Sequence, residues 1–355
     1  MHQRKHTSKH VASSSVTTYS ADQRLEKRGM IICLEIRLCD IWHRPSNPKM
    51  ATRENLTIKS SSKELHIALS VFTPHDASQP APVIIMGHGI GGIKAAGLTP
   101  FATAFTSHGY VAVTFDYLYF GESEGEPRNM MDISQELQDF RDVVAWARHQ
   151  PERFDVDRIV VWGSSFGGMH VTALLAEDHQ LAAGIAQCPC VDGLAAGLQT
   201  PFPQSLWLIL TAMKDYAKSL FGGDPVYVKL AGDGLPESPL AIMTGEEVVR
   251  GWKRLDPTED VPFPNKITAR SLLGFPFHRP VQRIHRSVKP LLIVLPTWDG
   301  QAPLHAAERA VKLAPLGEGL RVQGGHFDLY ANGPAFEENV TGQLEFLKRI
   351  LGPSA

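Results

Sequence analysis

The sequence is poor in cysteine, carries almost no net charge and contains no long apolar run. Four cysteines in 355 residues are too few and too unevenly spaced for a disulfide framework, which fits a reducing compartment. With 35 basic and 37 acidic side chains the formal net charge is -2, so no basic surface is available for nucleic acid or an anionic membrane. The sequence contains no run of about 18 apolar residues, the length that a membrane span needs. Its polar N-terminus also lacks the apolar core of a secretory signal. These absences predict a soluble, cytoplasmic protein with no nucleic-acid partner and no membrane span.

Two of the cysteines, Cys188 and Cys190, are separated by a single residue, and no second cysteine or histidine pair lies nearby. A metal or redox site usually needs such a second pair. The pair also follows an apolar, strand-like run. We therefore interpret both residues as buried structural thiols.

Residues 1–49 differ from the rest of the chain because they are polar and show no hydrophobic period. Such a segment buries no face, so we expect a disordered extension. It would be either a targeting or regulatory arm or sequence that precedes the functional start. Met50 opens two strand-like runs, at 56–58 and 65–72, with which a compact domain would begin.

From residue 82 onward, short apolar runs alternate with segments of helical period. An apolar run that is short and continuous is typical of a strand buried on both faces of a parallel sheet. The predicted strands are 83–87, 110–116, 158–162, 181–187, 289–296 and one around 320–323. One predicted helix begins at Thr99, which serves as N-cap before Pro100. Four further helices are predicted at 134–150, 169–177, 305–314 and 335–351. This rhythm predicts an α/β fold with a mostly parallel central sheet flanked by helices.

Residues 191–285 interrupt the alternation with helix-like pieces, several prolines and scattered Trp and Phe side chains. We interpret them as a largely helical cap inserted into a core formed by 50–190 and 286–355. The two domains that 355 residues suggest thus become one catalytic domain with an insertion.

The sharpest motif is GSSFGG at 163–168, directly after a predicted strand and before a predicted helix. In this context the G-x-S-x-G spacing places Ser165 on a tight strand-to-helix turn with its hydroxyl exposed above the sheet. The neighbouring Ser164 is out of frame with the glycines. Ser165 is therefore the predicted nucleophile.

A serine hydroxyl needs a general base, and that base needs a carboxylate that orients it. In this topology the acid and then the histidine follow the serine in loops after strands. Asp299 lies in the turn after strand 289–296, and His326 lies in a glycine-flanked loop before the last helix. Asp328 is the other acid near this histidine, and we interpret it as a cap of the last helix. Of the other histidines, His170 is expected to pack inside the elbow helix.

The glycine-rich loop at 87–92 fits an oxyanion hole, in which backbone N–H groups stabilise the charge that develops on a carbonyl oxygen. One amide should come from Phe166, the residue after the nucleophile. The other should come from Ile90, with Gly91 as second choice.

The same loop also satisfies G-x-G-x-x-G, and Asp116 ends the next strand where a ribose-binding acid is expected, so dinucleotide binding stays open as an alternative. Against it, the helix cues start only at Thr99, so the glycines do not open a helix. A P-loop is excluded because Lys94 is followed by Ala95.

Taken together, these motifs resemble those of the α/β-hydrolase superfamily from about Leu56 to Leu351. The resemblance rests on HGIGG, DYLYFGESEG, the GSSFGG elbow, TWDGQAP and GGHFD. More narrowly, GSSFGGMHV, AQCPCVDGLA and GHFDLY resemble fungal secondary-metabolite cluster hydrolases of the polyketide transferase type. The resemblance implies an α/β-hydrolase fold, hydrolysis of an ester or thioester, or transfer of a polyketide acyl chain to an alcohol. It also implies that Met50 matches the usual start of such proteins.

The sequence thus predicts a serine-dependent acyl hydrolase or acyltransferase that uses Ser165, Asp299 and His326 and needs no cofactor and no metal. The substrate would be a small-molecule or carrier-bound acyl group, and the aromatic cap favours an apolar one. A peptidase or a non-catalytic member of the fold are the rival interpretations. The oligomeric state stays open, a homodimer included.

Overall fold

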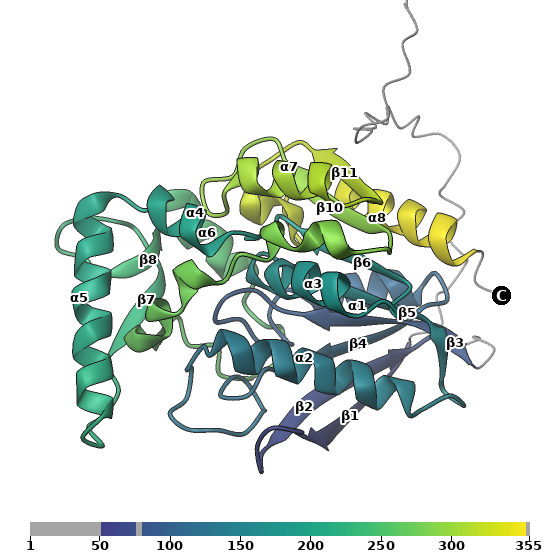
Figure 1. The fold of residues 1–355 in the computed structure, drawn as a ribbon, viewed down its shortest axis with the longest axis horizontal. Coiled ribbons are helices and arrows are strands. Elements are labelled where there is room, and N and C mark those ends of the chain that lie inside the picture. Colours follow the sequence, from purple (N-terminus) through teal and green to yellow (C-terminus); the bar gives the residue numbers. More distant parts are fainter. Residues whose placement is uncertain (1–50, 76–79, 353–355) are drawn as a thin grey trace, which may run out of the picture.

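An eight-stranded, mostly parallel sheet forms the centre of the computed structural model, which describes residues 51–75 and 80–352 (Figure 1). The strand order is β1-β2-β4-β3-β5-β6-β10-β11. Within this sheet only the β1–β2 and β2–β4 pairs are antiparallel. The strands are β1 (Thr52–Lys59), β2 (His66–Thr73), β3 (Ala81–Gly87), β4 (Val111–Phe115), β5 (Phe154–Ser164), β6 (Ala183–Gln187), β10 (Leu291–Pro296) and β11 (Gly317–Val322). The predicted fold class is confirmed.

Four of the inner strands are buried along their whole length because helices cover both faces of the sheet. Every residue of β3, β4, β6 and β10 is buried. Continuous apolar runs are what such strands require. The apolar runs in the sequence therefore predicted these strands well.

The flanking helices are α1 (Thr99–Thr106), α2 (Ile133–Arg148), α3 (Phe166–Glu177), α7 (Leu304–Leu313) and α8 (Phe336–Leu351). The connection from β3 to β4 runs in the opposite direction along the sheet from those that contain α2, α3 and α7. Because such crossovers are right-handed, α1 lies on one face and α2, α3 and α7 lie on the other. The last helix, α8, contacts α1.

The predicted start of α1 is wrong by one residue. Leu98 occupies the N-cap position without a side-chain cap, and Thr99 is already helical. Pro100, in the first turn, needs no backbone N–H there, so it can start the helix without a polar cap. Phe101 and Phe105 are buried, as the predicted helical spacing requires.

Between β6 and β10 the chain leaves the central sheet and forms a separate group of elements. These are α4 (Gly193–Gln199), α5 (Phe202–Ser219), β7 (Tyr227–Gly232), β8 (Ala241–Thr244), α6 (Glu246–Arg254), β9 (Ile267–Thr268) and the short 3-10 helices η1 (Ala269–Leu273), η2 (Phe275–Phe277), η3 (Pro280–Gln282) and η4 (Ile284–Arg286). The strands make a small second sheet in the order β8-β7-β9. The sequence did not predict this sheet, because its strands are short and lack continuous apolar runs. We call residues 191–285 the inserted segment.

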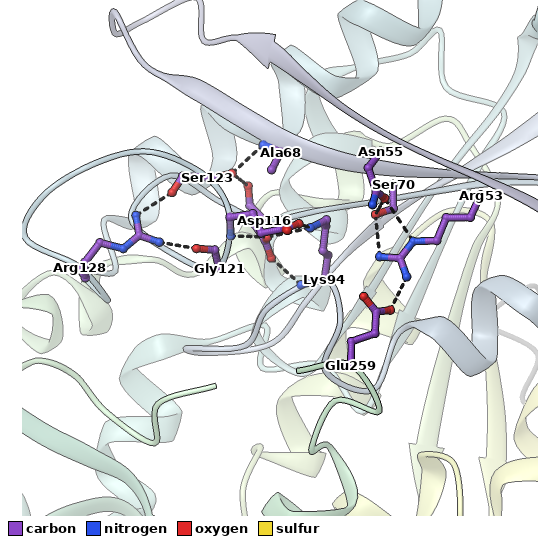
Figure 2. Close-up of polar contacts among 11 residues, drawn as sticks. Arg53, Asn55, Ala68, Ser70, Lys94, Asp116, Gly121, Ser123, Arg128 and Glu259 are labelled. Atoms are coloured by element: carbon purple, nitrogen blue, oxygen red, sulfur yellow. Dashed lines mark hydrogen bonds and ion pairs between the residues drawn. The ribbon is translucent and has the colours of Figure 1, made fainter. Parts of the chain in front are cut away.

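The inserted segment contacts the rest of the chain at several places, two of which are the loop after β3 and strand β1. On one side, Leu230 of β7 packs so closely on Gly91 that a Cβ there would lie 2.3 Å from Leu230 Cδ1. On the other, Glu259 pairs with Arg53 of β1, which also donates to Ser70 Oγ of β2 at 3.2 Å (Figure 2). Through the contact at Gly91 the segment is held beside the loop that follows β3, at the edge of the sheet where the predicted site residues lie.

The predicted extension, residues 1–49, lies outside the described residues. Among residues 51–75 and 80–352, no helix is both long and apolar enough to cross a bilayer.

Candidate active site

Ser165 lies on a strained turn between β5 and α3. Its φ is 55° and its ψ is -115°, an uncommon conformation for a residue with a side chain. The turn is fixed because the Ser165 N–H donates to Gln187 O at 2.8 Å and the Ser165 carbonyl accepts from Cys190 N at 3.0 Å. It also needs glycine, since a Cβ on Gly163 would lie 2.3 Å from the carbonyl carbon of Gly167. The side chain of Ser165 is left partly exposed.

Ser164, the out-of-frame serine, is fully buried and its hydroxyl is already engaged. Its Oγ lies 2.6 Å from the Tyr330 hydroxyl and accepts from Gln187 Nε2 at 2.9 Å. Ser165, and not Ser164, lines the cavity that also contains His326.

His326 and Asp299 form a buried pair. The Nδ1–H of His326 donates to Asp299 Oδ2 at 2.8 Å, and their side chains are 4% and 2% exposed. The other oxygen of Asp299 accepts from the backbone N–H groups of Gln301 and Ala302, each at 2.8 Å. The carboxylate is therefore fixed in one orientation and dictates which nitrogen of the imidazole carries the proton.

The environment of His326 acts on its pKa in two directions. Burial lowers the pKa, but the charge and hydrogen bond of Asp299 raise it by more, with a smaller contribution from Cys188. The net result is a pKa well above the ordinary value of histidine.

Asp328, the second acid near His326, points elsewhere. It lies on a short 3-10 helix, η5 (His326–Leu329), where its carboxylate accepts from the Gly325 N–H at 2.9 Å and pairs with Arg254 at 2.8 Å. The expected role as cap of the last helix is wrong, because Ala335 occupies the N-cap of α8. Asp328 instead closes the turn that carries His326.

A narrow cavity opens above Ser165 and is shared with His326 and the 87–92 loop. The loop touches the nucleophile turn, since a Cβ on Gly89 would lie 3.2 Å from Ser165 Cβ. Ile90 lines the same cavity. Phe166 begins α3, where the first backbone N–H groups have no partner within the helix. The structure thus brings Ser165, His326, Ile90 and the start of α3 together, with Asp299 behind the imidazole.

The far wall of this cavity comes from the inserted segment. Met243, Trp252 and Leu255 line it, and no carboxylate does. Its volume is about 30 Å³, enough for one or two water molecules. A cavity of this size holds no chain of several carbon atoms unless some of its lining side chains move.

Two histidines near the elbow are buried and neutral. Burial lowers the pKa of His88 to about 4 and that of His170 to about 3. His88 Nδ1 lies 2.9 Å from Gly89 O, and His170 Nε2 lies 3.0 Å from Glu136 Oε2. As predicted, His170 packs inside the elbow helix.

The turn that follows β4 is a structural unit rather than a nucleotide site. The buried carboxylate of Asp116 accepts from the backbone N–H groups of Lys94 at 2.6 Å and Glu122 at 2.9 Å, and it pairs with Lys94 Nζ at 3.3 Å (Figure 2). Arg128 closes the turn by donating to the carbonyls of Gly121 and Ser123, each at 2.6 Å. Because Asp116 is fully engaged and α1 begins well after the glycines, the geometry does not support dinucleotide binding.

A buried polar network under the elbow was missed by sequence reasoning. Gln187 Oε1 accepts from Asn339 Nδ2 at 2.6 Å and from Gln343 Nε2 at 3.1 Å, and Gln343 Oε1 accepts from Trp162 Nε1 at 2.7 Å. Through Gln187 and Ser164 this network reaches Tyr330, so it ties α8 and the histidine loop to the nucleophile turn. The only signal for this network in the sequence is that Asn339 and Gln343 are polar residues on the otherwise apolar face of α8.

Cys188 lies closer to the site than the sequence indicated. It is buried, as predicted, but its Sγ is 3.9 Å from His326 Nε2. Within residues 51–75 and 80–352, no group of three or more His, Cys, Asp or Glu side chains is arranged to hold a metal ion.

Known proteins share this architecture. Residues 64–203 match the family model of X-Pro dipeptidyl-peptidase (S15 family). The Quorum-quenching protein AidA of Acinetobacter baumannii (strain MDR-ZJ06) is 36% identical over 83% of this chain and 95% of its own length. Polyketide transferase grgF of Penicillium sp is 31% identical over 77% of this chain and 90% of its own length.

The crystal structure of alpha/beta hydrolase GrgF from Penicillium sp. sh18 superposes with a TM-score of 0.71 at 26% identity, covering 84% of this chain and 98% of that one. The fold, the geometry of the turn at Ser165 and the near-complete coverage of these relatives all indicate the same superfamily. The chain therefore belongs to the α/β-hydrolase superfamily and is an enzyme of that superfamily.

Proposed function

We propose that the protein hydrolyses an ester or thioester of an apolar acyl group through an acyl-enzyme formed on Ser165. The observation that carries the proposal is the buried His326–Asp299 pair, at 2.8 Å, whose imidazole lines the same cavity as the partly exposed Ser165 of the strained turn. Such a pair can hold an imidazole ready to take a proton from a serine.

The reaction proceeds in two halves. Ser165 Oγ attacks the acyl carbonyl carbon while His326 takes the serine proton, and the resulting oxyanion accepts hydrogen bonds from the N–H groups of Phe166 and Ile90. Collapse breaks the bond to the leaving alcohol or thiol, which takes the proton from His326. Water then attacks the acyl-enzyme with His326 again as base, and the acid and free Ser165 are released.

Transfer to an alcohol is the second candidate function. The apolar wall formed by Met243, Trp252 and Leu255 leaves room for very little water above Ser165. A site that excludes water favours a bound alcohol as the second nucleophile. A relative named polyketide transferase, 31% identical over most of its length, also supports a polyketide-like acyl group as substrate.

A dipeptidyl-peptidase activity is less well supported, although the S15 family model matches residues 64–203. A peptidase that recognises a free amino terminus needs a carboxylate near the nucleophile to pair with the ammonium group. The side chains that line the cavity include none. The inserted segment, which we propose as the cap of the site, presents apolar groups instead.

A fluorophosphonate probe followed by peptide mapping tests the nucleophile. We expect the parent protein and Cys188→Ala to be labelled on Ser165, and Ser165→Ala to be unlabelled. Labelling of Ser165→Ala at the parent rate would refute the assignment.

An acyl thioester substrate, assayed with and without a medium-chain alcohol, separates hydrolysis from transfer. Free acid under both conditions supports hydrolysis alone, whereas an ester that forms only with the alcohol supports transfer. No acid and no ester with any acyl chain length would refute both.

A further inference from the structure

Helix α5 presents a concentration of exposed apolar side chains that the catalytic site does not explain. Eleven of the sixteen large hydrophobic side chains that are exposed in the described chain lie between residues 194 and 221. In Figure 1 this helix stands at the left edge of the molecule, away from the central sheet. Exposed apolar residues normally occur singly, so a continuous patch of this kind indicates an interaction surface.

The exposed residues of α5 follow the spacing of a helix-pairing seam. Six of them, from the first residue of the helix to its C-cap, are spaced alternately four and three residues apart: Phe202, Leu206, Ile209, Met213, Tyr216 and Leu220. This alternation keeps side chains on the line where a second helix packs. A different stripe, made of Leu208, Ala212 and Asp215, is buried against the chain's own inserted segment. The helix therefore has two packing faces, and the seam is the exposed one.

A two-fold register centred on Met213 brings apolar side chains of the exposed face together, which favours a second copy of the same chain as the partner. Leu206 and Leu220 each lie seven residues from Met213. If two α5 helices pair antiparallel across a two-fold axis at Met213, Leu206 of one copy meets Leu220 of the other. A two-fold dimer requires this kind of self-complementary surface.

The helix dipoles favour the antiparallel arrangement, because it places the negative C-terminal end of each α5 near the positive N-terminal end of the other. Lys214 and Lys218 are exposed but point away from the seam, so they stay in solvent in either arrangement. Asp215, the acid between them, is buried and accepts from the N–H groups of Val226 and Arg270 at 2.7 and 2.8 Å. A formal net charge of -2 adds little repulsion between copies.

The exposed apolar face of α5 is also large enough for a stable dimer interface. The six seam residues and their neighbours Trp207, Leu210 and Phe221 are between 40% and 90% exposed. Because a whole aromatic side chain offers about 150–250 Å², this face offers roughly 1,000 Å². A stable interface of ordinary size buries about 800 Å² on each partner.

We propose that the protein is a homodimer joined by antiparallel pairing of its α5 helices along this seam. The contact would also steady the wall of the active site. Asp215 fixes α5 to the residues before β7 and to η1, and Leu230 of β7 packs on Gly91 of the loop above Ser165.

Light scattering and sedimentation velocity on the full chain at micromolar concentrations test the proposal. We expect the parent to be a dimer and Met213→Glu to be monomeric, with a dissociation constant raised about 100-fold, because two carboxylates would meet at the apolar axis. The control is Leu316→Glu, which puts the same charge on an apolar side chain that is 50% exposed outside the patch and should leave the dimer intact. Met213 is 57% exposed, so its substitution should not affect folding, and unchanged circular dichroism and melting temperature verify this.

A crosslinking experiment tests the antiparallel register. Met213→Cys should form an intermolecular disulfide on mild oxidation, whereas Lys218→Cys should not, since its two copies would lie about 15 Å apart along the pair. The parent is oxidised in parallel to account for the native thiols.

Three results would overturn the proposal: a monomeric parent, a dimer that survives Met213→Glu, or equal crosslinking of both cysteine variants. A monomer that binds phosphatidylcholine vesicles, and loses this binding in Met213→Glu, would assign the face to a lipid surface instead.

Discussion

The amide substitution Asp299→Asn tests the proposed mechanism most directly, because it preserves shape and changes only charge and proton position. In the structure Asp299 Oδ1 accepts two backbone N–H groups at 2.8 Å, and Oδ2 faces His326 Nδ1 at 2.8 Å. An asparagine keeps its oxygen on the two backbone donors, so its NH₂ must face Nδ1. An NH₂ group can only donate, and the imidazole proton therefore moves to Nε2.

A proton on Nε2 removes the lone pair that should take the proton of Ser165. The same swap in a serine protease triad lowers kcat about 10⁴-fold through the wrong tautomer. We expect a loss of this size here, equivalent to about 5.5 kcal/mol of transition-state stabilisation. KM should change only a few-fold, since Asp299 does not line the substrate cavity.

The assay is the hydrolysis of a p-nitrophenyl ester, with kcat and KM measured across pH and the rate of fluorophosphonate labelling as a second readout. Asp328→Asn is the matched control, because that carboxylate lies two residues after His326 but binds Gly325 and Arg254. It should retain activity within a few-fold. If Asp299→Asn keeps more than about a tenth of the parent kcat, or if both variants lose activity equally, the assigned role of Asp299 is wrong.

Three further outcomes are expected. First, kcat/KM of the parent should rise with pH through a midpoint above 6.5, because His326 acts as base only when neutral. Burial lowers its pKa, but Asp299 and Cys188 together raise it by more. A profile that falls with pH over this range would contradict the role. Second, Gly91→Ala should lower kcat about 10²–10³-fold, since φ is +61° there and the new Cβ would meet Leu230 Cδ1 at 2.3 Å; Gly274→Ala, whose Cβ meets nothing within 4 Å, should be neutral in the same assay. Third, Trp252→Ala should widen the cavity and raise the kcat/KM ratio of long over short acyl esters about tenfold; an unchanged ratio would show that the inserted segment does not set chain length.

The parts of the fold that were predictable from sequence are those with strong local signals. Buried parallel strands need continuous apolar runs, so β3 and β10 could be located within one or two residues. The turn at Ser165 is crowded by backbone on both sides, and only glycines at 163 and 167 leave room for it. The elbow was therefore visible as a motif.

What could not be predicted depends on contacts between residues far apart in the chain. The network under the elbow joins Trp162 and Gln187 to Gln343, separated by more than 150 residues, and no local pattern encodes such a pairing. The small sheet of the inserted segment has β9 with only two residues, too few for a period to register. Thr99 was predicted as N-cap because threonine is a good capping residue. In the structure Leu98 takes that position and Pro100 lies in the first turn, so a local signal was present but was one residue off.

The chemistry is easier to infer than the substrate because the two depend on different parts of the chain, the central sheet and the inserted segment. Ser165 and His326 follow strands of the central sheet, whose carboxyl ends meet at one edge whatever the inserted segment does. Trp252 and Leu255, which line the cavity above Ser165, come from that segment instead, and in the proposed reaction they decide which acyl group and which acceptor reach the serine. If the proposed function is correct, a change in the insertion can exchange water for an alcohol, or a short chain for a long one, without any change in the His326–Asp299 pair. Specificity and catalysis are encoded in different parts of the sequence, and only the catalytic part is constrained by the geometry of the sheet.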